Sequence, residues 1–374
     1  MPSATAGDGL LQRFAQLPSG REKPGRFWRI DLENLAVPEQ AAAYTEPVIE
    51  APAIRGGFAL DLRTAKERHS EIFARAFGAA VPHNDKKFAA LAAASWNTGA
   101  LVYVPAGVSV DDPIRIVYNA TNGALYPVTL VVLEEGARCT VVTEIEGSDG
   151  AFVCGIDEVV AAENAQHVFA SVQSLPEDAT AIFTRGAKPG RSASVSFDAA
   201  QLGAHLSVDT LDVNVDEPGA EGTINVLFFP RGTQHVDVVS TVAHNAGDSQ
   251  SQTLVKSAAT GNGQARYLGN IRIAPHAQHT ESALRDDALL LSKGAHIDSV
   301  PALEIAANDV KAYHGATVGA LDEEQIFYMT SRGISRDDAE RMIALGFFEP
   351  VVERFPTEAL RERIRETLAA KAAQ

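Results

Sequence analysis

The chain has 374 residues but only two cysteines, Cys139 and Cys154. Two thiols are too few for a disulfide framework or for a self-contained metal site of four cysteines. No run approaches the roughly 20 apolar residues that a membrane helix needs. The first residues carry neither the basic nor the apolar segment of a secretory signal. The sequence therefore predicts a cytoplasmic protein that does not span a membrane.

Basic residues are also scarce. The chain has 32 Lys and Arg against 48 Asp and Glu, so its formal net charge is −16. General nucleic-acid binding requires a basic surface that neutralises phosphates, and we expect none here. The acidity suits solubility and a protein partner of complementary charge.

Familiar enzyme signatures are missing as well. Residues 186–192 superficially resemble a phosphate loop but lack its Gly-Lys-Ser/Thr ending. Gly261 and Gly263 lack the third glycine of a dinucleotide fingerprint, and neither a Gly-x-Ser-x-Gly elbow nor a His-Glu-x-x-His helix occurs. If the protein depends on nucleotide energy, another subunit must supply it.

The first of three stretches, residues 1–95, mixes helical patterns with Pro and Gly breaks. Pro38 opens a short helix predicted over residues 38–44. A longer helix is predicted over residues 63–77, and an alanine-rich helix over residues 86–95. This part is expected to be an accessory helical region.

Residues 96–319 form a long series of short β-branched runs that end at Gly, Asn or Asp. Turns made of a small or polar residue followed by Ala recur along it, for example at Asn164, Gly219 and Gly294. No helical pattern separates the runs, which argues against a doubly wound sheet. A solenoid, in which each rung covers its neighbour, fits better, with a β-sandwich as the alternative.

Residues 320–374 are predicted to be helical again. The first helix has an acidic first turn and ends before Gly333. Ser335 caps a second helix that should stop near Gly346, and residues 356–357 open a third. Leu360, Ile364 and Leu368 form an apolar stripe on this last helix. The stripe is expected to pack on the chain's own C-terminal helices, with a partner protein as the alternative.

Seven of the ten histidines fall within the strand-rich stretch, from His205 to His314. His235 and Asp237 share one face of a strand, because side chains alternate, and His244 is expected on the next rung. Imidazole and carboxylate at this spacing could hold a metal. The favoured interpretation is hydrogen-bonded polar residues on the solvated face of a strand.

The other candidates are weaker. His276 and His279 lie in a predicted turn and are interpreted as surface residues, with metal binding as the lesser alternative. Cys139 and Cys154 sit inside strand runs, where a lone cysteine is usually a small buried hydrophobe. His296 is placed on a rung near the end of the strand-rich stretch, without a role.

Residues 303–319 are the most informative segment. His314 precedes Gly315, at which the backbone can approach another surface closely. An imidazole exposed at the edge of the solenoid could ligate iron through a neutral nitrogen. A ring that caps the passage from strand to helix is an equally supported alternative.

Residues 303–334 resemble the SufB/SufD family of iron–sulfur cluster assembly proteins. Residues 232–237, 249–252 and 289–292 resemble further family motifs, and residues 18–22 and 27–29 weakly resemble the start of SufD chains. His314-Gly315-Ala316-Thr317 matches the SufD form rather than the Glu-His-Glu-Ala-Thr of SufB-like chains. The chain is also short for a SufB.

The resemblance implies a mainly β fold, with a right-handed parallel β-helix core (residues 96–319) between N-terminal (1–95) and C-terminal (320–374) helical regions. It implies a non-ATPase scaffold subunit in complex with a SufB-like subunit and a SufC-like ABC ATPase, the latter docking on the C-terminal helices. His314 would contribute to a transient iron–sulfur cluster shared with SufB. The resemblance also associates a flavin (FAD) with the complex, although the sequence shows no flavin motif. Homodimerisation of the isolated subunit is an alternative that the sequence leaves open.

One departure from the family pattern bears on that site. Many SufD chains carry Cys two residues before the histidine, where this chain has Ala312. His314 is then the only ligand that the motif offers, and the partner must hold most of any cluster.

Two rival functions stay open. A SufB-like homodimeric scaffold would work around its own cysteines, but Cys139 and Cys154 are far from the motif in sequence. A β-helix enzyme acting on polysaccharide would need a row of charged residues along one strand face, which the sequence does not reveal.

Overall fold

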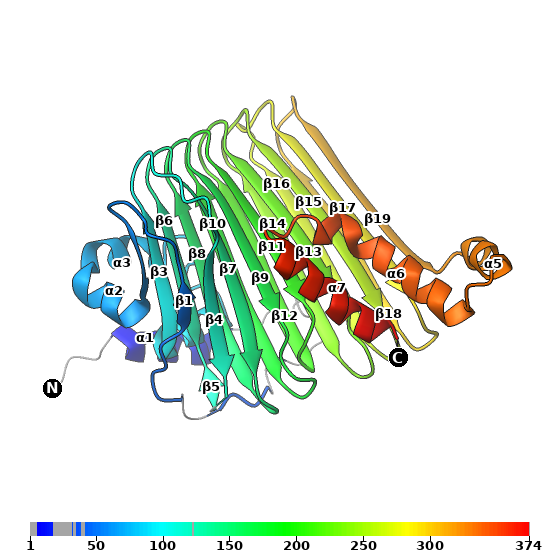
Figure 1. Cartoon of the computed structure of the whole chain (residues 1–374). Helices are drawn as coiled ribbons and strands as arrows, with labels where there is room; N and C mark the ends of the chain where they lie inside the picture. Colours follow the sequence, from blue (N-terminus) through cyan, green and yellow to red (C-terminus); the bar gives the residue numbers. More distant parts are fainter. Residues whose placement is uncertain (1–5, 18–31, 33–34, 39–41, 122, 374) are drawn as a thin grey trace.

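The computed structural model describes residues 6–17, 32, 35–38, 42–121 and 123–373. Two parallel sheets face each other along one axis, and each strand of the solenoid pairs with a strand of the neighbouring rung (Figure 1). One sheet has nine strands in the order β1-β4-β7-β9-β11-β13-β15-β17-β19, and the other has ten in the order β18-β16-β14-β12-β10-β8-β6-β3-β2. The mainly β, parallel solenoid prediction is confirmed.

The strands have the following bounds: β1 Val48–Glu50, β2 Phe58–Asp61, β3 Thr98–Val104, β4 Ile114–Ala120, β5 Ala124–Leu125, β6 Pro127–Leu133, β7 Arg138–Gly147, β8 Phe152–Ala161, β9 Gln166–Gln173, β10 Thr180–Pro189, β11 Ser194–Gln201, β12 Leu206–Val215, β13 Glu221–Phe228, β14 His235–His244, β15 Gln250–Ala259, β16 Gln264–Ile273, β17 Glu281–Leu290, β18 His296–Ile305 and β19 Lys311–Ala320. Only β1 with β4 and β2 with β3 pair antiparallel among the described strands. A β-sandwich is built from antiparallel sheets, so that alternative is wrong.

A column of turns explains the recurring small-or-polar–Ala pattern. Asn164, Ser192, Asp248 and His279 all adopt positive φ, as do several glycines at the same corner. The backbone N–H of each of these four residues donates to a backbone carbonyl in the turn of the next rung. The distance is 2.9 Å from Asp248 to Gln278 and 2.6 Å from His279 to Asp309. The stacked turns thus continue the hydrogen bonding of the sheets around the corner.

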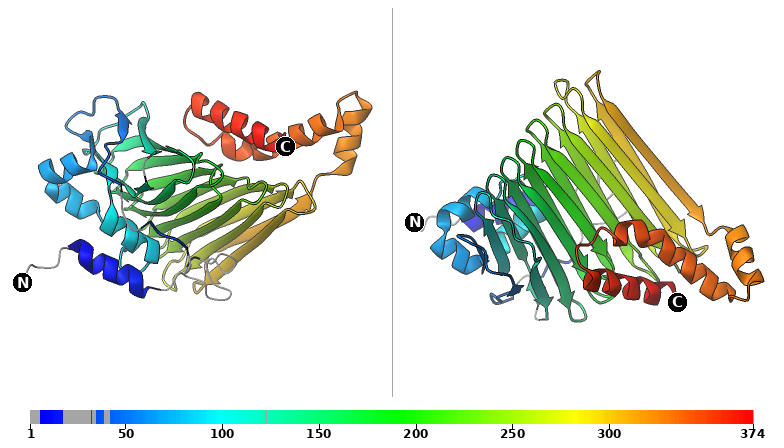
Figure 2. Two further views of the ribbon diagram at one scale, coloured as in Figure 1. Left: turned by 90° about the horizontal axis from the view of Figure 1, so that it is seen from below. Right: turned by 45° about the horizontal axis from the view of Figure 1, so that its top comes forward.

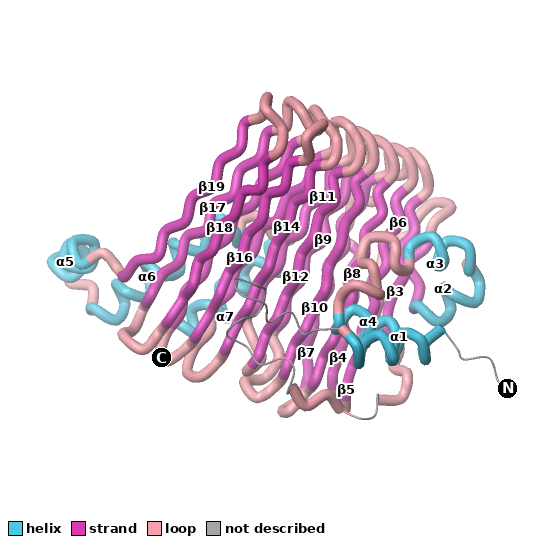
Figure 3. Tube along the Cα trace, turned by 180° about the vertical axis from the view of Figure 1, so that it is seen from behind, coloured by secondary structure: helices cyan, strands magenta, loops and turns pink. Residues whose placement is uncertain are grey.

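Helices cover the outer faces of both sheets. The helical bounds are α1 Ala6–Gln16, α2 Leu62–Arg68, α3 Ser70–Ala76, α4 Lys87–Ser95, α5 Glu323–Ser331, α6 Arg336–Val352 and α7 Glu358–Ala372. The N-terminal helices pack on the ten-stranded sheet, as the view from behind shows (Figure 3). Helices α6 and α7 lie across the nine-stranded sheet, while α5 stands beyond the end of the solenoid (Figure 2).

Several local predictions need correction. The helix expected over residues 63–77 is two helices, because His69 leaves helical geometry (φ −134°, ψ 48°) and stacks on Phe58. In the helix expected over residues 38–44, residues 39–41 lie outside the described residues, and Pro38 and residues 42–44 are not helical.

The C-terminal helices follow their predicted caps. Ser335 and Thr357 accept hydrogen bonds from backbone N–H groups in the first turns of α6 and α7. Helix α6, however, does not stop near Gly346 but continues to Val352. The stripe of Leu360, Ile364 and Leu368 is buried against α6 and the nine-stranded sheet, so it packs on its own chain.

Candidate functional site

His314 lies on β19, the last strand of the nine-stranded sheet. Its aligned neighbour on β17 is Leu284, a buried core residue, so His314 faces the inside of the solenoid. Tyr313 points the opposite way and is 61% exposed. The Nδ1 atom of His314 is buried, yet no described residue makes a hydrogen bond to it. The imidazole is therefore half-enclosed at the end of the lumen, and it does not cap the strand-to-helix passage through Nδ1.

The glycine after this histidine has a local explanation. A Cβ atom at position 315 would displace the hydroxyl end of the exposed Tyr313 side chain on the same strand. The close approach of the Gly315 backbone to another surface stays a prediction.

Asp286 lies next to His314 on the same inward face. It sits on β17, two residues beyond Leu284, and pairs in register with Ala316. The side chain is fully buried, and Ser299 of β18 donates a hydrogen bond to Oδ2. Within the described part of the chain, Oδ1 has no hydrogen-bond partner. Burial raises the pKa of Asp286 to about 7, against the opposing effect of the Ser299 hydrogen bond.

The rung that carries His314 ends the solenoid. Strands β19 and β18 terminate their sheets, so each has one edge without a neighbouring strand among the described residues. Exposed apolar side chains gather on these two strands: Val300, Ile305, Tyr313 and Val318. Open strand edges with apolar side chains are typical of a surface that another protein covers.

His235, Asp237 and His244 do not form a metal site. All three lie on β14, so His244 is not on the next rung, and it faces inward whereas His235 and Asp237 face outward. No group of three or more His, Cys, Asp or Glu side chains suited to a metal exists among the residues the structure describes.

Hydrogen bonding accounts for two of these side chains. Asp237 forms an ion pair with Arg266 at 2.8 Å. The two ring nitrogens of His244 form hydrogen bonds with the hydroxyls of Ser249 and Ser251, at 2.7 and 2.9 Å. Burial lowers the pKa of His244 to about 4. The hydrogen-bonded interpretation is confirmed, but the predicted solvated face is wrong, because Asp237 and His244 are buried.

The remaining histidine predictions agree with the structure. His276 and His279 are exposed turn residues, and His279 lies 3.1 Å from Asp248 and 3.3 Å from Asp309. His296 begins β18, the next-to-last strand, and its Nε2 is 2.9 Å from Asp298.

Both thiols are buried. Burial raises the pKa of Cys139 to about 12 and also raises that of Cys154. Cys139 lies 3.4 Å from His167, but burial lowers the pKa of that imidazole to about 4, so no ion pair activates the thiol. Their strands, β7 and β8, lie far along the sheets from β19 and β18. Both are small buried side chains, as predicted.

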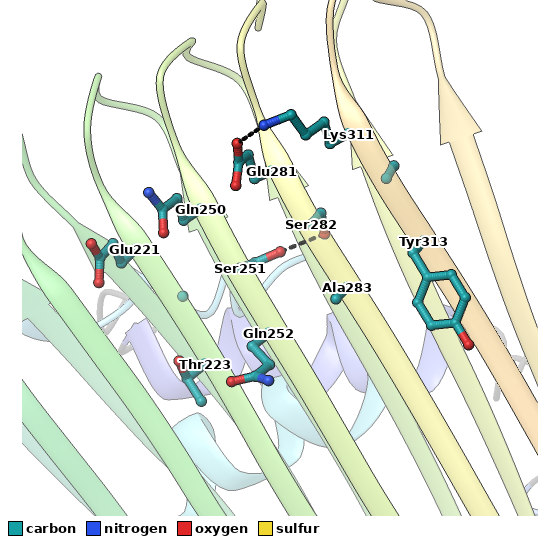
Figure 4. Close-up of a pocket in the computed structure, with 12 residues that line it drawn as sticks. Glu221, Thr223, Gln250, Ser251, Gln252, Glu281, Ser282, Ala283, Lys311 and Tyr313 are labelled. Carbon is teal, nitrogen blue, oxygen red and sulfur yellow. Dashed lines mark hydrogen bonds and ion pairs between the residues drawn. The ribbon is translucent and has the colours of Figure 1, made fainter.

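A polar groove of about 550 Å³ crosses the outer face of β13, β15, β17 and β19 (Figure 4). Glu221, Gln250, Glu281 and Lys311 form one row across it in register. Lys311 donates to Glu281 at 2.5 Å. The row mixes acid, amide and base across four strands, whereas a polysaccharide-acting site was expected to cluster charged residues along the face of one strand.

Sequence reasoning missed Asp286 and Ser299. The available signal was a carboxylate at an inward position, since Leu284, Asp286 and Ala288 occupy alternate residues of one strand. Recognising it required knowing which face of β17 is inside.

Among the described helices, none is both long and apolar enough to cross a membrane.

The family model for "SUF system FeS cluster assembly, SufBD core domain" matches residues 116–347. The chain belongs to the SufBD family. This match contains the site residues Asp286, Ser299 and His314.

Relatives carry the same family name. Proteins named "Iron-sulfur cluster assembly SufBD family protein" from Staphylococcus epidermidis (strain ATCC 12228), Staphylococcus haemolyticus (strain JCSC1435) and Staphylococcus aureus (strain MRSA252) are each 28% identical to this chain over 307 residues. The alignments cover 80% of this chain and 65% of each relative. The chain therefore spans less than two thirds of the length of these SufBD proteins.

Proposed function

We propose that this SufBD-family chain is a SufD-type scaffold subunit of a cytoplasmic SUF complex, with His314 as its ligand for iron or a nascent cluster at the interface with a SufB-type subunit. The supporting observation is the buried Nδ1 of His314 at the open end of the solenoid, which has no hydrogen-bond partner among the residues that the structure describes. A neutral imidazole nitrogen there can bind iron while the apolar last rung contacts the partner.

The division of labour within the complex follows from the same proposal. The chain has no nucleotide-binding signature, so ATP hydrolysis belongs to a SufC-type ATPase that docks on residues 320–374. Exposed Phe327, Tyr328 and Met342 on α5 and α6 supply apolar contacts for it. The isolated subunit pairs with a second copy through the same open end. FAD in the complex stays a prediction, and nucleic acid is not a partner.

The buried thiols count against a SufB-like homodimeric scaffold. A cysteine that accepts sulfide or binds iron must be reachable as a thiolate, and burial disfavours the thiolate at Cys139 and Cys154. The SufD-type role needs no thiol from this chain.

The test is co-expression with SufB- and SufC-type subunits, anaerobic purification, and assay of iron and sulfide per complex. His314→Ala should assemble normally but carry markedly less of both. His296→Ala, an exposed histidine on the adjacent terminal strand, is the matched control and should equal wild type. Equal cluster content in His314→Ala and wild type would remove the ligand role, and absence of a complex would refute the SufD-type assignment.

A further inference from the structure

We propose that Asp286 acts together with His314 as a two-residue half-site for a ferrous ion inside the mouth of the solenoid. The inference rests on the proposed function and names the form in which iron enters it. Asp286 supplies a carboxylate oxygen, His314 supplies Nδ1, and Ser299 holds the carboxylate in place.

The register of the last two strands brings these groups together. Asp286 pairs with Ala316, and His314 pairs with Leu284, so the two side chains are diagonal neighbours on one face of adjacent parallel strands. Neighbouring strands lie about 4.8 Å apart and alternate residues about 6.6 Å apart along a strand, so an aspartate and a histidine at such positions can reach one common ion. A metal ion bound to both would lie on the inward face of the sheet, between β17 and the terminal strand β19.

Each of the two residues presents a buried polar atom that is unsatisfied within the described structure: Oδ1 of Asp286 and Nδ1 of His314. A buried acceptor without a partner costs free energy, and a buried carboxylate costs more. Two such atoms on the inward face of neighbouring strands, at the open end of the solenoid, point to a shared ligand that binds both.

Two other inward-facing aspartates, further along the solenoid, have their negative charge compensated by a buried cation. Asp157 and Asp209 share the guanidinium of Arg185, which is 3.0 Å from Asp209. Lys256 lies near Asp286 but its Nζ donates to Asp287 on the outer face, at 2.8 Å. Asp286 thus accepts a hydrogen bond from the Ser299 hydroxyl, whereas Asp157 and Asp209 are paired with a guanidinium. A metal ion bound to Asp286 would supply the positive charge.

The donor set selects the class of ion. Imidazole nitrogen and carboxylate oxygen suit divalent iron, whereas the soft Cu(I) ion prefers sulfur, and neither thiol of this chain is nearby. Two protein ligands leave most coordination positions free for water or for groups from a partner. The half-site therefore holds iron as a mononuclear ion that can be passed on.

The 374-residue chain is titrated anaerobically with Co²⁺, and binding is measured from the absorption bands of the bound ion. A second titration uses Fe²⁺ in competition with a chromogenic chelator. Wild type should bind one ion per chain. Asp286→Asn and His314→Ala should each weaken binding by about 10- to 100-fold. Asp198→Asn is the matched control, because Asp198 is equally buried but bonded to Asn225 and Ser196, and it should bind as wild type does.

Asp286→Ser provides a second uncharged variant, and thermal unfolding checks that each variant is folded. Binding by Asp286→Asn and Asp286→Ser within threefold of wild type, or no stoichiometric binding by wild type, would overturn the half-site. Iron and sulfide assays of complexes carrying the same variants separate the two proposals. Cluster loss in His314→Ala alone would leave the proposed function standing and refute the role of Asp286, whereas normal content in both variants would refute both.

Discussion

Arg185 and Asp209 form an ion pair inside the solenoid, with Nε of the guanidinium 3.0 Å from Oδ1 of the carboxylate. Asp157 pairs with the same guanidinium from the neighbouring strand β8, and Gln201 donates to Asp209 at 2.6 Å. All four side chains are buried. One cation thus compensates two carboxylates inside the solenoid core.

Replacing Arg185 should strongly destabilise the protein. Arg185→Met leaves two carboxylates buried without a cation, and breaking a buried pair in this way costs about 3–5 kcal/mol. Urea unfolding at pH 7 measures the change in the free energy of unfolding. Asp157→Asn/Arg185→Met/Asp209→Asn removes all three charges and should recover most of the loss, whereas an equally unstable triple variant would contradict the electrostatic explanation.

Asp198 should make stability depend on pH. Burial raises its pKa to about 6, so the folded protein binds this proton more tightly than the unfolded chain does. Stability therefore falls as pH rises from about 4 to about 6. Asp198→Asn keeps an acceptor for Asn225 and Ser196 but has no charge. It should be about 2 kcal/mol more stable than wild type at pH 7.

The two proteins should converge in stability near pH 4, where Asp198 is protonated in the folded state. Urea unfolding at several pH values gives the comparison. A difference between wild type and Asp198→Asn that stays constant from pH 4 to pH 7 would show that the carboxylate charge is not the cause.

Glu144 should anchor the last helix to the solenoid. Its carboxylate, nearly buried on β7, accepts from Arg115 at 2.8 and 2.9 Å and from Arg363 of α7 at 2.7 Å. These contacts lower the pKa of Glu144 despite its burial. Glu144→Gln should cost about 1–3 kcal/mol and speed amide hydrogen exchange in α7.

Glu146→Gln is the control for that experiment. Its carboxylate lies 3.7 Å from the same Arg363 but is 44% exposed, so its loss should change little. Equal exchange in α7 for Glu144→Gln and Glu146→Gln would show that apolar packing alone fixes the helix.

Phe327 should matter for assembly but not for folding. Its side chain is 74% exposed on α5, the helix that stands beyond the solenoid. Phe327→Ser should unfold at the wild-type temperature but lose copurification with the proposed SufC-type ATPase. Val48→Ser, also at an exposed apolar residue, is the control. Retention of the ATPase by Phe327→Ser would refute docking at this surface.

Local signals made much of this architecture predictable. β-branched runs marked the strands, and positive-φ residues such as Asn164 and Gly219 marked the corners. Ser335 and Thr357 marked the helix starts through their own side chains. Each of these signals depends on residues a few positions apart, which a sequence displays directly.

Features set by distant contacts could not be predicted in the same way. The chain breaks its helix at His69 because the ring stacks on Phe58. Helix α6 continues past Gly346 because its own residues Phe348, Val351 and Val352 are buried against the nine-stranded sheet and α7. His314 was singled out by its motif, but its inward direction and the neighbouring Asp286 follow only from the register of β17 and β19.

The contact of α7 with β7 also constrains when the protein can finish folding. Arg363 and Glu144 are 219 residues apart, so the rungs emerge from the ribosome long before the helix that covers them. Rungs stack through neighbours close in sequence and can form in order during synthesis. The outer face around Val142 and Ala170, which α6 and α7 cover in the folded protein, then stays uncovered until these two helices have been synthesised. A nascent chain that stalls before α6 therefore exposes this apolar sheet surface, to which chaperones can bind and through which chains can aggregate.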